Sequence, residues 1–127
     1  MTMTEGILHS DAVSVRAGRL HLAVHLPWYR SLPVSCLEAV EVTVDGARAP
    51  LRSVSTGGFT GPLADAVGSA AWWDLRDALD VALDVPAAFG VTHQVGLALA
   101  VRIPYIQQAP GVPLVQRATA QIEGTVR

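Results

Sequence analysis

The histidines are the first residues in this sequence whose spacing could do chemistry. His21 and His25 lie four residues apart in a stretch that alternates as a β-strand does, so both point to one face of the strand. At about 3.3 Å per residue the two rings stand roughly 13 Å apart, which is too far to share one metal ion. We therefore expect His21 and His25 to face solvent or a partner.

An acidic group in the second half of the chain could hold a hard cation such as Ca²⁺. Its members are Asp74, Asp77, Asp80 and Asp84. No loop here has the glycine-punctuated spacing of oxygen ligands that a calcium site needs, so a solvated strand face and turn is the better interpretation. The single cysteine, Cys36, has no electropositive partner motif, which favours a small buried hydrophobe over a reactive thiol.

Motifs of the common catalytic sites are missing from this sequence. The glycine-rich residues 57–61 precede no helix, so they lack the anion site of a phosphate-binding loop. No serine lies in a Gly-x-Ser-x-Gly elbow, and no nucleophile, base and orienting group are grouped together. We therefore predict no catalytic residue, no metal and no cofactor in this chain, which instead binds or shapes something else.

Aromatic and proline residues are concentrated in one segment. Residues 26–33 read Leu-Pro-Trp-Tyr-Arg-Ser-Leu-Pro. Trp28, Tyr29 and Arg30 are of the residue types that most often anchor protein interfaces. The prolines, Pro33 among them, restrict the backbone and lower the cost of ordering it on binding. The composition fits an interface loop and a loop that tucks its aromatics into its own core about equally well.

Two adjacent tryptophans and a phenylalanine form a second candidate group. Trp72 and Trp73 would point to opposite sides of a strand, so at most one easily joins the core. Phe59 lies in a glycine-rich stretch where little else is apolar. We consider Trp72, Trp73 and Phe59 as candidates for contact with a substrate or a partner.

The elements that carry these residues are predicted by alternation of apolar and polar residues. Apolar residues recur at every second position over 13–15 and 20–26, with Ala17–Gly18 between them as a turn or a bulge. A strand from Leu37, the pair Asp45–Gly46 and a second strand form the strongest short hairpin signal in the chain. Pro50 lacks a backbone donor, which places this second strand at an edge or a bulge.

Later segments complete an all-β prediction. We expect a long central loop over residues 55–69, strands over 77–85 and 90–102, a loop over 107–113 and a last strand over 114–126. Strands separated by turn signals indicate an antiparallel β-sandwich of about 7–9 strands. We expect residues 1–127 to form a single domain, with residues 1–10 as a flexible N-terminal segment.

Composition excludes several classes of function. The chain has 127 residues, a net charge of -2 and no lysine, so it lacks the basic patch of a nucleic-acid-binding protein. No segment is long and apolar enough to cross a membrane as a helix, and no signal peptide is evident. These features favour a cytoplasmic protein without nucleic acid or membrane partners. The apolar fraction of 50% suggests that another chain covers part of the surface.

Four segments together resemble the β subunit of C-glycoside deglycosidases. They are residues 26–33, then Glu-Val-Thr-Val-Asp-Gly at 41–46, Trp-Trp-Asp at 72–74 and Val-Arg-Ile-Pro-Tyr at 101–105. Their order and spacing fit over residues 13–126. The segment at 26–33 is moderately specific, whereas the hairpin at 41–46 is common to many proteins.

The resemblance implies a division of labour between two chains. In that family a TIM-barrel α subunit holds a divalent metal, typically Mn²⁺, and the small β-sandwich packs on it. The complex cleaves the carbon–carbon bond of 3-oxo-C-glycosides of flavonoid or anthraquinone type by β-elimination. The resemblance gives this chain no catalytic residue. It gives an interface role to Trp28, Tyr29, Arg30 and Pro33, and less directly to Tyr105.

Two other functions remain open from the sequence. A free-standing carbohydrate-binding sandwich would stack sugar rings on Trp28, Trp72 or Trp73. A self-assembling structural β protein would explain the apolar composition alone. Binding of glycans by the lone chain, or its size with and without its genetic neighbour, would separate these alternatives.

Overall fold

The computed structural model describes residues 6–127, which form eleven strands and two short 3₁₀ helices. The strands are β1 (Val13–Arg16), β2 (Arg19–Val24), β3 (Leu32–Pro33), β4 (Leu37–Val44), β5 (Ala47–Ala49), β6 (Leu51–Thr56), β7 (Phe59–Gly61), β8 (Trp72–Trp73), β9 (Leu79–Pro86), β10 (Thr92–Ala109) and β11 (Val112–Thr125). The 3₁₀ helices are η1 (Val34–Cys36) and η2 (Leu63–Gly68).

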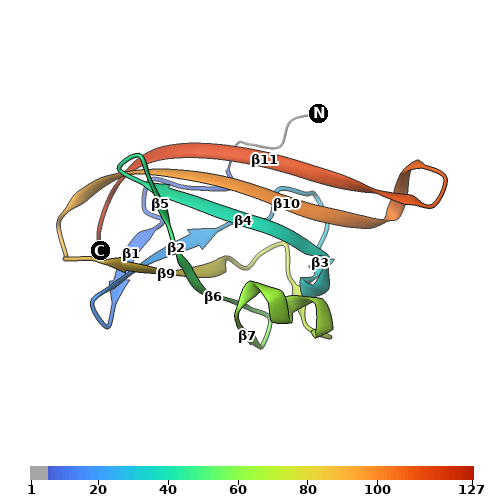
Figure 1. Ribbon diagram of the computed structural model, residues 1–127, viewed down its shortest axis with the longest axis horizontal. Coiled ribbons are helices and arrows are strands. Elements are labelled where there is room, and N and C mark those ends of the chain that lie inside the picture. The colour runs from blue at the N-terminus through green and yellow to red at the C-terminus, as the bar shows by residue number, and fades with distance from the viewer. Residues whose placement is uncertain (1–5) are drawn as a thin grey trace.

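Two antiparallel sheets form the two layers of a sandwich (Figure 1). One has the strand order β1-β2-β9-β6-β7, and the other has the order β11-β10-β4-β5. A small third sheet pairs β3 with β8. The predicted all-β sandwich is confirmed. Its strands outnumber the predicted 7–9 because β3, β5, β7 and β8 have only two or three residues each, which is too short for alternation to register.

The core lies between the two layers and follows the period of two along each strand. In β4, Val40, Val42 and Val44 are buried, whereas Glu41 and Thr43 between them are exposed. The same alternation runs through β2 and the first half of β10. Burying each such aliphatic side chain contributes about 1.5–3 kcal/mol, so the register of these strands is strongly specified.

Two tight turns connect strands as the sequence predicts. Asp45 and Gly46 have φ angles of 52° and 84°, and Ala17 and Gly18 have φ angles of 51° and 75°. Positive φ at both central residues is the type I′ geometry that matches the twist of a two-residue hairpin. Both predicted turns are therefore confirmed.

Pro50 marks the point at which the chain changes sheets. β5 ends at Ala49 on the edge of the four-stranded sheet, and β6 begins at Leu51 inside the five-stranded sheet. Proline cannot donate a ladder hydrogen bond, so it suits this crossing. The sequence predicted one strand over residues 47–54 at an edge or a bulge. β5 does lie at an edge, but the strand is divided at Pro50 and β6 lies inside the other sheet.

Three local predictions were wrong. The expected loop over residues 55–69 contains the end of β6, all of β7 and η2, because Gly57 and Gly58 (φ 59° and 89°) turn the chain in two residues. The expected loop over residues 107–113 is a continuation of the β10–β11 hairpin, in which Pro110 and Gly111 alone turn the chain. In both segments glycines and prolines made a short turn look like a long loop.

The N-terminal segment is the third correction. We expected residues 1–10 to be flexible, but Ile7 and Leu8 are buried in the core. The carbonyl of Ile7 also accepts a hydrogen bond from the backbone N–H of His25 (2.8 Å). Residues 1–5 lie outside the described part of the chain.

Candidate docking surface

Four of the five predicted interface residues converge at one place. The indole Nε1–H of Trp28 donates a hydrogen bond to the hydroxyl of Tyr105 (2.6 Å). The guanidinium carbon of Arg30 lies 5.1 Å from the centre of the Tyr105 ring, within cation–π range. The rings of Trp28 and Tyr29 are 4.9 Å apart. We call Trp28, Tyr29, Arg30 and Tyr105 the aromatic docking cluster.

The aromatic docking cluster is exposed although its members already contact one another. Tyr29 is 59% exposed and Tyr105 is 48% exposed, whereas Trp28 is half-buried against the core. Side chains that are fixed before a partner arrives lose little entropy on binding. Large exposed aromatics beside an arginine have the composition of an interface hot spot.

The loop that carries Trp28 is held at both ends. At its start, the ring of His25 stacks on that of His9 with 4.4 Å between ring centres, in addition to the backbone bond to Ile7. At its end, the hydroxyl of Ser31 accepts a hydrogen bond from the backbone N–H of Leu75 (2.7 Å). Burial, and then the neighbouring His9, lower the pKa of His25, so this environment favours the neutral imidazole of His25.

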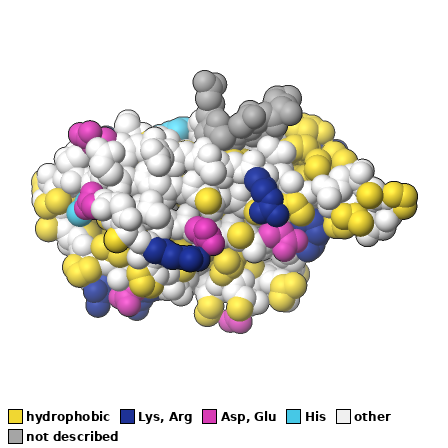
Figure 2. Space-filling model, turned by 45° about the horizontal axis from the view of Figure 1, so that its top comes forward, with side chains coloured by type: hydrophobic (Ala, Val, Ile, Leu, Met, Phe, Trp, Pro, Cys, Tyr) yellow, Lys and Arg dark blue, Asp and Glu magenta, His cyan; other side chains and the backbone are white. Residues whose placement is uncertain are grey.

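A projecting hairpin supplies the other side of this surface. Beyond Ile103 the pairing of β10 with β11 shifts register, and the hairpin extends past the body of the sandwich (Figure 1). We call residues 104–113 the finger. It carries no charged residue, and hydrophobic side chains show along it in Figure 2. Tyr105 joins the base of the finger to the loop that carries Trp28.

The finger is a part of the candidate surface that sequence reasoning missed. Residues 107–113 were predicted to be a loop, so no hairpin that extends beyond Tyr105 was expected. The signal that could have found the finger is charge: the sequence has no charged residue between Arg102 and Arg117. A solvent-facing hairpin without charges is unusual, because exposed hairpins usually carry charged side chains on their edges.

The fifth predicted interface residue, Pro33, lies in a neighbouring small sheet. It pairs with Trp72, while Leu32 pairs with Trp73. Trp72 is 56% exposed, whereas Trp73 is 2% exposed and its indole N–H donates to the carbonyl of Asp77 (2.9 Å). The prediction that Trp73 faces a substrate or partner was therefore wrong, and Trp73 is the one of the two that joins the core.

Phe59 follows two glycines, and one of them, Gly57, contacts the small β3–β8 sheet. Phe59 is half-buried and packs against the core, so only part of its ring can reach a ligand. Gly57 approaches the backbone of Trp72 so closely that an added Cβ would overlap the carbonyl oxygen. Close backbone approach is a recognised reason for glycine next to a strand.

In the acidic group that could have held a cation, Asp74, Asp80 and Asp84 are instead paired with basic residues. Asp80 accepts from Arg16 (2.6 Å) and lies 3.1 Å from His21. Asp74 accepts from Arg76, which lowers the pKa of Asp74 to about 2. Within residues 6–127 no three His, Cys, Asp or Glu side chains gather around a possible ion position, so these residues do not fit a metal.

Other titratable groups are also satisfied locally. Asp45 accepts hydrogen bonds from His93 (2.7 Å) and from the backbone N–H of Gln94 (2.9 Å), which together lower its pKa. Cys36 is buried, as predicted, although the guanidinium of Arg102 approaches its sulfur at 3.8 Å.

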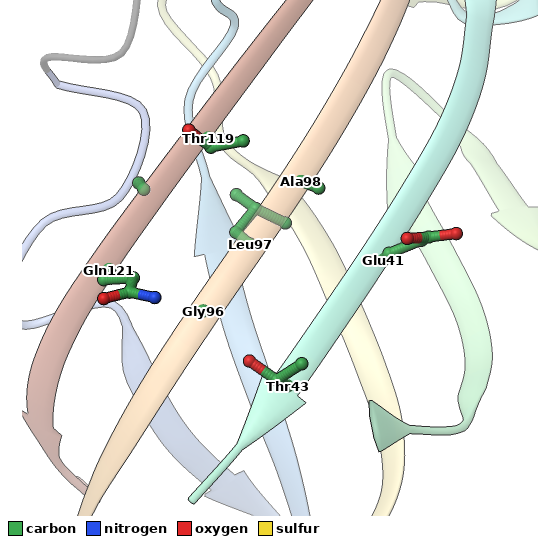
Figure 3. Close-up of a pocket in the computed structure, with 8 residues that line it drawn as sticks. Glu41, Thr43, Gly96, Leu97, Ala98, Thr119 and Gln121 are labelled. Carbon is green, nitrogen blue, oxygen red and sulfur yellow. The ribbon is translucent and has the colours of Figure 1, made fainter. Parts of the chain in front are cut away.

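A shallow hollow on the outer face of the four-stranded sheet has little to hold a ligand. It forms because Gly96 has no side chain between Thr43 and Gln121 (Figure 3). The acid on its rim, Glu41, is paired with Arg48 (3.0 Å). The hollow therefore offers small polar contacts and no reactive group.

Comparison with known proteins gives three relatives that span most of the chain. A β subunit of C-glycoside deglycosidase from Arthrobacter globiformis is 34% identical over 117 residues, 87% of each chain. A β subunit of 3′-dehydrocarminate deglycosidase from a Microbacterium species is 34% identical over 125 residues, 92% of this chain and 90% of the relative. This chain belongs to the family of C-glycoside deglycosidase β subunits. No protein-family model matches the sequence.

A third member of the C-glycoside deglycosidase β-subunit family supports the same assignment. The Microbacterium trichothecenolyticum subunit is 31% identical over 105 residues, 79% of each chain. The resemblance predicted from four short segments is thus confirmed over most of the sequence. Among the described residues, no helix is long and apolar enough to cross a membrane.

Proposed function

We propose that this chain is the accessory β subunit of a cytoplasmic bacterial C-glycoside deglycosidase complex and docks on a catalytic α subunit through the aromatic docking cluster and the finger. One observation carries this proposal. Trp28 and Tyr105 lie 77 positions apart in sequence, yet they hydrogen-bond at the surface beside an exposed arginine. A surface built in this way serves binding, because the side chains are fixed but not buried.

The proposed division of labour follows from what the described residues lack. Asp45, Asp74 and Asp80 are each paired with a neighbouring basic residue, and no three His, Cys, Asp or Glu side chains among residues 6–127 gather as metal ligands. On the resemblance to the C-glycoside deglycosidase family, we assign the catalytic base and the divalent metal, Mn²⁺, to a TIM-barrel α subunit. Bound there, the metal supplies Lewis-acid stabilisation of negative charge. The docking surface of this chain supplies a partner contact and no proton transfer.

The reaction that we propose for the complex is elimination from an oxidised glycoside. The 3-oxo group acidifies the hydrogen on C2, and a base on the α subunit removes it. The electrons of that C–H bond form a C1–C2 double bond while the bond from C1 to the aglycone breaks. The aglycone carbon, of a flavonoid or an anthraquinone, then takes up a proton. One relative is named for 3′-dehydrocarminate, which supports an oxidised sugar as substrate.

Co-expression with the α subunit tests this proposal. Release of the aglycone from a 3-oxo-C-glycoside is measured for this chain alone, for the α subunit alone and for the purified complex. We expect full activity only from the complex. Full-rate cleavage by this chain alone would overturn the division of labour.

Trp72 favours one alternative function, a carbohydrate-binding module. Its exposed ring on β8 is free to stack on a sugar, independently of the aromatic docking cluster. Glycan binding by the lone chain at micromolar concentration, lost in Trp72→Ala but kept in Trp28→Ala, would support that alternative. Absence of binding together with a stable α–β complex would favour the accessory subunit.

A further inference from the structure

Within the described part of the chain, the outer edge of β11 has no strand partner over residues 114–123. Past the end of β11, Arg127 exchanges backbone hydrogen bonds with Val13 (3.2 Å) and Val15 (3.0 Å) of β1. β11 pairs only with β10, which lies on its other side. Twelve consecutive residue pairs, from Thr92↔Thr125 to Ile103↔Leu114, keep one unbroken register. No proline interrupts residues 114–125. Soluble proteins usually protect such an edge with prolines, bulges or inward-pointing charges, and β11 has none of these over this stretch.

Side chains along this edge alternate between two chemically different faces. Ala118 is buried, and Ala120 and Ile122 are half-buried against the core. Thr119 and Gln121 lie on the outer face beside the shallow hollow (Figure 3). Arg117 and Glu123 continue that outer face, one on either side, and both are exposed.

We infer that a second copy of this chain pairs antiparallel along β11, about a two-fold axis at Ala120. In an antiparallel pair of identical strands, the residue numbers of every two opposed residues add up to the same sum. This sum must be even, because only then do inner-face residues lie opposite inner-face residues. A sum of 240 places Arg117 opposite Glu123 of the second copy, and Glu123 opposite its Arg117. It also places Ala118 opposite Ile122 on the inner face.

Charge selects this register over its neighbours. At a sum of 238 Arg117 meets Gln121, and at a sum of 242 it meets Thr125, so neither register pairs the two charges. Opposite charges directly across a strand pair stabilise it, and like charges destabilise it. Arg117 forms no ion pair among residues 6–127, and Glu123 accepts only the amide of Gln94 (3.1 Å). Both charges are therefore available to the second copy.

The pairing leaves the aromatic docking cluster and the finger outside the interface. Antiparallel strands run in opposite directions, so the two fingers project in opposite directions from the central strands of a continuous eight-stranded sheet. The number eight follows from two copies of the four-stranded sheet. The inference goes beyond the proposed function and does not depend on it.

Charge reversal tests the pairing on the full chain. Dimerisation is measured by sedimentation equilibrium for the wild type, Arg117→Glu, Glu123→Arg and the double variant. We expect each single variant to raise the dimer dissociation constant by about tenfold or more, since two attractive pairs become repulsive. The double variant restores both pairs and should return close to the wild-type value. Arg52→Glu, an exposed arginine on β6, is the matched control and should change nothing.

A cross-link tests the position of the axis independently. In Ala120→Cys the two new thiols face each other across the two-fold axis, at a distance that permits a disulfide. We expect a covalent dimer under oxidation, and none from Ala98→Cys on β10 or from the wild type, whose Cys36 is buried. A monomeric wild type, a dimer indifferent to both single reversals, or a double variant that stays dissociated would overturn the inference.

Discussion

At the scale of single residues, one phenol ring connects the docking loop to the finger. Tyr105 accepts a hydrogen bond from Trp28 through its oxygen and faces the guanidinium of Arg30 with its ring. Each contact already restricts the rotamers of a side chain in the free subunit. The side chain therefore loses less conformational entropy when the partner docks. Trp28 and Arg30 therefore combine the residue types and the rigidity that make interface hot spots.

The first prediction follows from that rigidity. Trp28→Ala and Arg30→Ala should each weaken association with the α subunit by about 2 kcal/mol or more, roughly 30-fold in Kd. Titration calorimetry with purified α subunit measures the change. Arg48→Ala is the control, because Arg48 pairs with Glu41 at the exposed β5 edge, away from the docking loop. Unchanged affinity in both test variants would remove the interface assignment.

A second prediction concerns pH and His25. Burial and His9 lower the pKa of His25 in the folded chain, with Asp11 partly opposing them. The unfolded chain therefore binds more protons between that lowered pKa and the ordinary value of about 6.5. This contribution to the free energy of unfolding is complete above pH 6.5 and is lost as the pH falls through that window. Urea midpoints at pH 7.5 and 5.5 should differ less in His25→Gln than in the wild type.

At the scale of elements, the β6–β7 turn depends on a glycine for two reasons. Gly57 has a positive φ of 59°, and an added Cβ would overlap the backbone of Trp72. Gly58 also has a positive φ, of 89°, but open space surrounds it. The two glycines therefore separate the cost of backbone strain from the cost of a steric clash.

Alanine at each glycine gives the third prediction. Gly58→Ala should cost about 1–2 kcal/mol of unfolding free energy through left-handed strain alone. Gly57→Ala adds overpacking against β8, about 1–3 kcal/mol more. Urea unfolding measures both. Equal destabilisation of the two variants would mean that the contact between Gly57 and Trp72 is not tight in solution.

The fourth prediction concerns the finger. Replacing residues 104–113 by an Asn-Gly turn should close the hairpin at Ile103↔Leu114, where the register with β11 is still regular. We expect the shortened chain to fold, because the core strands are intact, but to lose α-subunit binding. Circular dichroism and co-purification measure the two properties. Retained binding would place the partner contact elsewhere.

Sequence predicted those elements whose signal is local. β2, β4 and β9 carry strict alternation, and the Asp45–Gly46 hairpin carries its own turn chemistry. The finger was missed because proline and glycine in a two-residue turn resemble a loop. Sequence named Trp28 and Tyr105 as site residues, but their contact depends on the bend of β10 after Ile103, which no local pattern encodes. For the same reason the choice between Trp72 and Trp73 for the core required the pairing of β3 with β8.

At the scale of the whole molecule, the sandwich presents two surfaces that share no residue. The aromatic docking cluster and the finger lie at one end, and the free edge runs along the middle of β11 (Figure 1). Changes at separate, non-contacting sites are usually additive. A complex with the α subunit should therefore contain two β chains joined through β11.

The fifth prediction tests this independence. Arg117→Glu should halve the number of β chains per particle while leaving the affinity for the α subunit unchanged. Trp28→Ala should weaken the affinity for the α subunit while leaving the β–β dimer intact. Sedimentation velocity on both complexes measures particle mass. A loss of both interactions from either change would show that the two surfaces are coupled.

The three tryptophans lie in three different environments, which gives the chain its own optical probes. The indole of Trp73 is enclosed, that of Trp72 is open to water, and that of Trp28 is partly covered with its N–H held by Tyr105. Emission from an enclosed indole lies at shorter wavelength than emission from a hydrated one, and soluble quenchers reach only the latter. Single-tryptophan variants would thus report unfolding, ligand contact and subunit docking as separate fluorescence signals, without any attached dye.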